Sequence, residues 1–111
     1  MGGKNYFNMM SKDLLVIIGK GDFSIIDVNQ YNIVRIIKVR DLSDTMVTCM
    51  LNENIILTGD YYEKIKQWKI ESDNLKLIYT KEKAHNRCVS ELIQLNDGHI
   101  LSGSYGEFKI W

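Results

Sequence analysis

Short apolar segments alternate with clusters of turn residues along the whole chain of 111 residues. The segments are about five or six residues long and rich in Ile, Val, Leu and Tyr. No window keeps apolar residues at the i, i+3, i+4 and i+7 spacing of an amphipathic helix. Proline is absent, so Gly, Asn and Asp must form the turns. The pattern predicts an all-β chain.

The spacing of the turn residues divides the chain into eleven expected strands. Asn96-Asp97-Gly98 lies between two apolar runs and indicates a tight hairpin, because Asp and Gly tolerate positive φ angles. The strands are expected near 5–10, 14–18 and 23–28, then near 33–38, 46–51, 55–59 and 64–70, and finally near 75–80, 88–93, 99–103 and 107–111.

The sequence also repeats itself. "ILTGDYYEKIKQW" at 56–68 is echoed by "ILSGSYGEFKIW" at 100–111, which places Gly59 and Gly103 44 positions apart (103 − 59). A gapless offset of 40 aligns Gly19 with Gly59. Periods of this length occur in propeller blades and in helical pairs of the armadillo type, and the strand pattern favours the blade. The three copies span approximately 5–28, 33–70 and 75–111.

The third copy is similar to most of a WD repeat. In "KAHNRCVSELIQLNDGHILSGSYGEFKIW", Ala84-His85 stands where that family has Gly-His, Asn96–Gly98 forms the turn, and Trp111 stands at the family tryptophan. The resemblance covers nearly the whole chain. It implies one domain over 1–111, a partial β-propeller of antiparallel four-stranded blades. Two full blades plus three strands of a third would form an open arc.

The resemblance further implies a buried hydrogen-bond network that joins a His, a Ser or Thr, a Trp and an Asp in each repeat. The Asp position of the third copy falls around Gly106 and Glu107, where this copy is one residue short. We therefore expect no copy to complete the network. The residues assigned to it are Thr58, Trp68, His85, Ser102 and Trp111.

Composition and isolated motifs restrict the chemistry. Lys plus Arg equals Asp plus Glu, 14 against 14, so no basic excess indicates nucleic-acid binding. No apolar run approaches the length of a membrane span. Cys49 and Cys88 lie in apolar stretches and indicate two reduced, buried thiols in an intracellular protein, for which we expect a cytoplasmic location without excluding the nucleus. His85 and Cys88 make one loose pair, too few ligands for zinc, so no cofactor is expected.

Tyrosines in the turns are the best candidates for function. They lie outside the apolar runs, and exposed tyrosine anchors many protein interfaces. Together with the resemblance, this predicts a non-catalytic scaffold that binds other proteins, with neither nucleic acid nor membrane as a partner. The candidate contact residues, all in loops at one rim, are Arg40, Asp60, Tyr61, Tyr62, Arg87 and Tyr105.

The number of repeats leaves alternatives open. A propeller needs typically four to eight blades, so this chain cannot close a ring alone. Ending at Trp111, inside a strand, favours a fragment. Further blades in cis or self-association would then complete the surface. One alternative is the non-catalytic propeller part of a larger enzyme or regulator, and another is a self-assembling structural ring.

Overall fold

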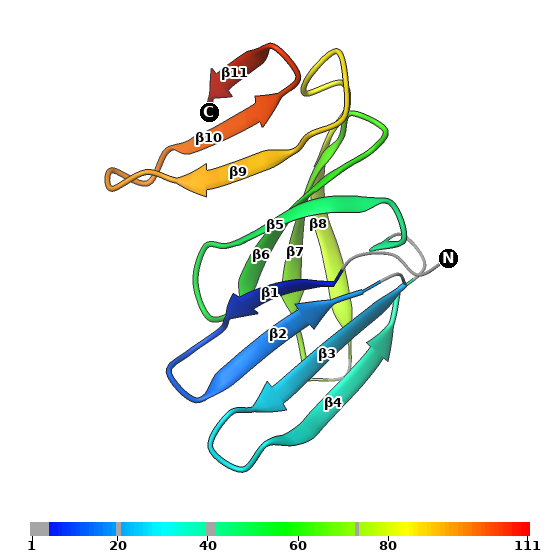
Figure 1. The fold of residues 1–111 in the computed structure, drawn as a ribbon, viewed down its shortest axis with the longest axis vertical. Coiled ribbons are helices and arrows are strands. Elements are labelled where there is room, and N and C mark those ends of the chain that lie inside the picture. The colour runs from blue at the N-terminus through cyan, green and yellow to red at the C-terminus, as the bar shows by residue number, and fades with distance from the viewer. Residues whose placement is uncertain (1–4, 20, 40–41, 73) are drawn as a thin grey trace.

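A computed structural model describes residues 5–19, 21–39, 42–72 and 74–111. These residues form eleven strands in three antiparallel sheets that follow one another along the molecule (Figure 1). The first sheet contains β1 (Tyr6–Met9), β2 (Leu14–Ile18), β3 (Asp22–Asp27) and β4 (Asn32–Lys38). The second contains β5 (Thr45–Met50), β6 (Ile55–Asp60), β7 (Ile65–Ile70) and β8 (Leu75–Lys81). The third contains β9 (Glu91–Gln94), β10 (Ile100–Ser104) and β11 (Glu107–Ile110). The chain is an all-β, open, partial propeller with two full blades and three strands of a third.

The sheets are offset by one strand from the repeats of the sequence. β4 pairs with β3 and β8 pairs with β7, so the strands expected near 33–38 and 75–80 close the preceding sheets. The incomplete sheet is therefore the third and not the first. The cause is hairpin formation, because consecutive antiparallel strands joined by a short turn pair with each other before they pair with anything else.

The alignment of Gly19 with Gly59 is wrong by one residue. The Gly19 N–H donates to Asp22 O at 3.0 Å, and two residues lie between them in the chain. The equivalent bond in the second sheet runs from the Asp60 N–H to Lys64 O, and three residues lie between those two. Ile18, paired with Phe23, therefore occupies the place that Gly59 occupies in the second sheet. Because side chains alternate between the two faces of a strand, this shift decides which residues enter the core.

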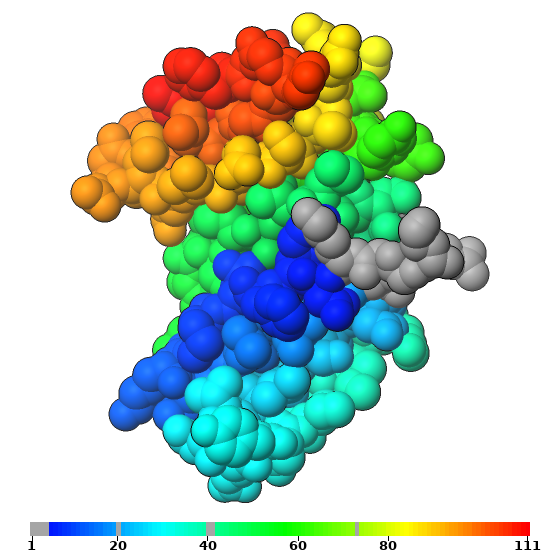
Figure 2. Space-filling view, viewed as in Figure 1, coloured from blue at the N-terminus to red at the C-terminus, as the bar shows by residue number. Residues whose placement is uncertain are grey.

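Two apolar layers hold the sheets together. Between the first and second sheets lie Val16, Ile18, Phe23, Ile25, Ile37, Leu42, Ile56, Trp68, Ile70 and Leu75. Between the second and third sheets lie Leu57, Ile65, Ala84, Val89 and Leu92. The space-filling view shows the three sheets in contact along the molecule (Figure 2). Among the described residues, no helix has the length and apolar character to cross a membrane.

The turns between strands follow the expected chemistry. Gly98 has φ of 93°, and its N–H donates to Leu95 O at 2.9 Å, so Asn96-Asp97-Gly98 forms the predicted hairpin between β9 and β10. Gly106 has φ of 82° in the β10–β11 turn. A side chain at either position would be strained in this left-handed conformation.

Candidate functional site: a tyrosine groove at the rim of two sheets

Three connections meet at one end of the second and third sheets. They are the β6–β7 turn, the long β8–β9 loop and the β10–β11 turn (Figure 1). Residues from the first two connections line a groove, which we call the tyrosine groove: Tyr61, Tyr62, Glu63, Asn86, Arg87 and Cys88. Aromatic side chains form one wall and the β8–β9 loop forms the other.

The aromatic residues at the groove are exposed and ordered by contacts with one another. Tyr61 and Tyr62 are 60% and 57% exposed, and their rings meet edge to face with centroids 5.3 Å apart. The Arg87 guanidinium lies 5.3 Å from the ring centroid of Tyr105, which is 80% exposed. These contacts fix the rings in place at little cost to their accessibility.

The side chain of Asp60 stabilises the β6–β7 turn. Its Oδ1 accepts the backbone N–H groups of Tyr62 at 2.9 Å and Lys64 at 3.0 Å. Glu63 follows in the left-handed region with φ of 67°. Asp60 is only 4% exposed, so its assignment as a partner-contact residue is wrong. It positions Tyr61 and Tyr62, because a buried carboxylate satisfied by turn N–H groups holds the backbone that carries them.

Backbone hydrogen bonds fasten the β8–β9 loop to the same turn. Val89 donates to Asp60 O at 2.9 Å, and Ala84 donates to Glu63 O at 2.8 Å. The segment from Asp60 to Glu63 therefore carries the tyrosine wall of the groove and also anchors the loop that forms the other wall. Asp44 O also accepts the Tyr61 N–H at 3.0 Å, which attaches the turn to the β4–β5 connection.

The structure brings together four of the predicted contact residues: Tyr61, Tyr62, Arg87 and Tyr105. Arg40 lies outside the described residues. Sequence reasoning missed three groove residues, which are Glu63, Asn86 and Cys88. Their positions beside Tyr62 and Arg87 in the chain are the only signal that could have included them.

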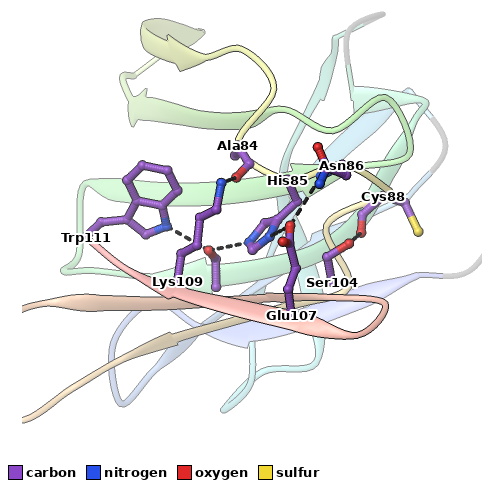
Figure 3. Close-up of polar contacts among 9 residues, drawn as sticks. Ala84, His85, Asn86, Cys88, Ser104, Glu107, Lys109 and Trp111 are labelled. Carbon is purple, nitrogen blue, oxygen red and sulfur yellow. Dashed lines mark hydrogen bonds and ion pairs between the residues drawn. The ribbon is translucent and has the colours of Figure 1, made fainter.

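A buried polar network supports the β8–β9 loop from the side of the third sheet (Figure 3). His85 is 1% exposed, and its Nε2 lies 2.7 Å from Ser102 Oγ. Trp111 Nε1 donates to the same Oγ at 2.7 Å. On the other side of the ring, His85 Nδ1 lies 2.7 Å from Glu107 Oε1. An ionised carboxylate only accepts, so Nδ1 carries the hydrogen that is donated to Glu107.

Glu107 corrects the expectation that no copy completes its network. Its longer side chain reaches His85 although the β10–β11 turn is one residue short, and it also accepts the Asn86 N–H at 3.3 Å. The hydrogen bonds from His85 first, and from Asn86 second, hold the pKa of Glu107 below its ordinary value. In the second sheet the expectation holds, because Trp68 Nε1 donates to Thr58 Oγ1 at 2.9 Å with no His to continue the chain.

The arrangement of Ser102, His85 and Glu107 has the residue types of a catalytic triad. Ser102 is 0% exposed, and its hydroxyl lies against both His85 and Trp111. A substrate carbonyl has no path to this oxygen while the third sheet is packed on the second. The geometry makes the three residues a clamp that joins the β8–β9 loop to β10 and β11.

The two cysteines are free and half-buried, which corrects the expectation of buried thiols. Cys88 lines the tyrosine groove, whereas Cys49 packs against the apolar layer between the second and third sheets. Burial raises the pKa of the Cys49 thiol. Among the described residues, no group of three or more His, Cys, Asp or Glu side chains could hold a metal ion.

Comparisons with known proteins give a likeness of fold. No family model matches the chain, and no curated protein matches it. A solved structure, "Crystal structure of the computationally designed Ika4 protein", superposes with a TM-score of 0.58 over 99% of this chain and 92% of that chain. The sequences are 16% identical, so the likeness concerns the fold alone.

Acid should weaken the clamp around His85. Because the pKa of Glu107 is lowered in the folded state, its contribution to stability is present above the ordinary glutamate pKa of about 4.3 and disappears as pH falls through the lowered value. Urea unfolding of Glu107→Gln should therefore show a deficit in stability relative to the parent at pH 7 that is smaller at pH 3. The exposed Glu53→Gln is the control and should show no deficit at either pH. A deficit of Glu107→Gln that is the same at both pH values would contradict this role.

Proposed function

We propose that this chain is a non-catalytic platform that binds other proteins through the tyrosine groove, as its resemblance to WD repeats implies. The observation that carries the proposal is the concentration of exposed, mutually ordered aromatic side chains at one rim. Tyrosine and arginine dominate the energetics of protein interfaces, because both present large contact areas with few rotatable bonds.

The chemistry of the groove indicates the kind of segment that fits it. Arg87 stacks on Tyr105 and, within the described part of the chain, forms no ion pair, so its donors are available to a carboxylate. Tyr61 and Tyr62 offer apolar ring faces beside it. We expect a partner segment that carries an acidic side chain next to an aromatic or aliphatic one.

Replacing Tyr61, Tyr62 and Tyr105 together with alanine should weaken partner binding at least about tenfold. The reason is that truncating a single hot-spot tyrosine typically lowers the affinity by more than about tenfold. Affinity capture with quantitative mass spectrometry would compare the parent and the variant. The far-ultraviolet dichroism should stay unchanged, since all three side chains project into solvent.

A matched control carries alanine at Phe7 on β1 and at Tyr31 in the β3–β4 turn, which are exposed aromatic residues far from the groove in sequence. Partners that bind through the groove should be lost from the triple variant and retained by this control. Partner binding should also slow iodoacetamide alkylation of Cys88 and leave the rate at Cys49 unchanged. Equal capture by the triple variant and the parent would refute the assignment of the groove.

A second candidate function is self-assembly into a ring. Exposed apolar side chains cover the outer faces of both terminal sheets, with Phe7, Met9, Ile33 and Ile36 on the first and Ile93, Phe108 and Ile110 on the third. Large exposed apolar patches indicate association. Sedimentation velocity over a hundredfold concentration range would distinguish a closed oligomer from a monomer.

A further inference from the structure

The β6–β7 turn differs from the corresponding turns of the other two sheets. In each sheet a short turn joins the second strand to the third, and a residue with a left-handed backbone lies at its end. This residue is Gly21 in the first sheet and Gly106 in the third, each with φ of 82°. In the second sheet it is Glu63, with φ of 67°. Glycine adopts this conformation without strain, whereas a residue with a Cβ atom does not.

The side chain of Glu63 lies in the tyrosine groove and is half-buried there. Within the part of the chain that the structure describes, its carboxylate forms no ion pair. Its backbone O accepts the Ala84 N–H at 2.8 Å, which fixes the residue against the β8–β9 loop. A strained residue that presents an unpaired charge to a groove indicates a role in binding, because the fold alone would be served by glycine.

Two aromatic walls stand beside this carboxylate. The β6–β7 turn has three residues between its closing pair, Asp60 and Lys64, whereas the β10–β11 turn has two, and the longer turn carries a second tyrosine. The rings of Tyr61 and Tyr62 are almost perpendicular, at 89°. The faces of aromatic rings attract cations. Together with Glu63, the two rings therefore make this wall of the groove favourable for a positive charge.

The opposite wall carries a positive charge of its own. Arg87 lies between Asn86 and Cys88, which are held to the third sheet through the Asn86 N–H at 3.3 Å and the Cys88 O at 2.7 Å (Figure 3). Its guanidinium stacks on Tyr105 and forms no ion pair with Glu63 or with another described residue. The groove thus keeps one negative and one positive group apart, on facing walls.

The size and surroundings of the groove fit a ligand that carries both charges. Its volume of about 490 Å³ lies within the range of pockets that hold small ligands. Neighbouring charges do not neutralise the two groups, because Lys64 pairs with Glu82 at 3.8 Å and the Asp60 carboxylate is buried in the turn. A purely acidic segment would meet repulsion from Glu63, and a purely basic one from Arg87.

We propose that the tyrosine groove binds a segment of a partner protein in which a lysine and an acidic residue lie two positions apart. The methylene stem of the lysine packs on Tyr61 and Tyr62, and its ammonium donates to Glu63. The acidic side chain accepts from Arg87. Residues two positions apart project to the same side of an extended segment, so both can enter the groove. The inference rests on the proposed function and specifies the aliphatic side chain beside the acid as that of a lysine.

The probes are two labelled peptides with blocked ends, Gly-Ser-Asp-Ala-Lys-Ser-Gly and Gly-Ser-Lys-Ala-Asp-Ser-Gly, one for each direction of the segment. Fluorescence anisotropy should show that at least one of them binds the parent. Replacing its lysine with norleucine, or its aspartate with asparagine, should weaken binding at least about tenfold, because each change removes a charged hydrogen bond. Arg87→Gln should bind the aspartate and asparagine peptides alike.

Glu63→Gly gives the second turn the residue type of the other two turns. Its thermal midpoint should equal or exceed that of the parent, since the left-handed strain is relieved. It should bind the peptide at least about tenfold more weakly and should no longer distinguish lysine from norleucine. Glu63→Gln, which removes only the charge, should weaken binding to a similar extent. Tyr31→Gly, at φ of 55° in the β3–β4 turn, is the control for the backbone change and should bind as the parent does.

Three results would overturn this proposal. One is that neither peptide binds the parent, and another is that the parent binds the lysine and norleucine peptides equally. The third is a lower midpoint of Glu63→Gly, which would show that the side chain serves the fold. Partners that are lost from the triple tyrosine variant but retained by Glu63→Gly would contradict the lysine assignment and leave the proposed function standing.

Discussion

Replacing Phe23 with alanine should lower the free energy of unfolding by about 3–5 kcal/mol, the range for removing a large aromatic side chain from a packed core. Phe23 is 0% exposed and belongs to the apolar layer between the first and second sheets. Its removal leaves a cavity that neighbours on two rigid sheets cannot fill. Urea unfolding followed by tryptophan fluorescence would measure the loss, because Trp68 lies in the same layer.

Phe108 supplies a matched control within the same chain. It pairs with Gly103 as Phe23 pairs with Ile18, at the equivalent register position of the third sheet, but is 70% exposed. Phe108→Ala should change stability by no more than about 0.5 kcal/mol, as expected for an exposed residue. A large loss at Phe108 would show that the outer face of the third sheet is covered in solution. A small loss at Phe23 would contradict the packing of the first two sheets.

Gly59→Ala should destabilise the protein by about 1–3 kcal/mol through overpacking. A Cβ atom at Gly59 would lie 2.6 Å from Val89 Cγ1 and 2.9 Å from Val47 Cγ1. Both valines belong to the layer between the second and third sheets, so the two sheets would have to separate locally. Thermal unfolding should show a lower midpoint. Val89 belongs to the β8–β9 loop, and this loop forms one wall of the tyrosine groove. Displacing Val89 should therefore also weaken partner binding at the groove.

Gly103 is the matched control for Gly59. It occupies the equivalent position on β10, but its Cβ would meet only the side chain of Glu91, at 3.0 Å on the exposed outer face. The nearest atom is the Glu91 Cβ, and a contact at 3.0 Å requires a smaller shift than the contacts at 2.6 and 2.9 Å around Gly59, so Gly103→Ala should cost less than Gly59→Ala. Equal costs at the two glycines would indicate backbone strain in place of the proposed steric conflict.

The candidate groove was only partly accessible to sequence reasoning. Tyr61, Tyr62 and Tyr105 were recognisable because they interrupt turn segments where no core could receive them. The prediction for Asp60 fails because the two tyrosines that follow it are exposed, whereas its own carboxylate turns inward to the N–H groups of Tyr62 and Lys64. Such a local hydrogen-bonded turn depends on backbone angles that residue type alone does not fix.

The closure of the polar network also required three-dimensional information. The sequence places Glu107 near the expected Asp position, but the turn is one residue short, and this spacing predicts an incomplete network. In the structure its additional methylene group spans the difference, and the carboxylate reaches His85 Nδ1 at 2.7 Å. Side-chain reach across a turn depends on the strand register, which is set by the β10–β11 hairpin.

Sequence by itself determined the all-β class, the strands, the period near 40 residues and the hairpin at Asn96–Gly98, because these follow from local residue patterns. Only the tertiary structure decided how the strands divide into sheets and that Ile18 and not Gly19 matches Gly59. These features depend on pairing and packing between distant segments. A shift of one residue in strand pairing moves every side chain to the opposite face of the sheet, and the sequence of the strand is the same before and after the shift. Only the packed sheets therefore fix which face is buried.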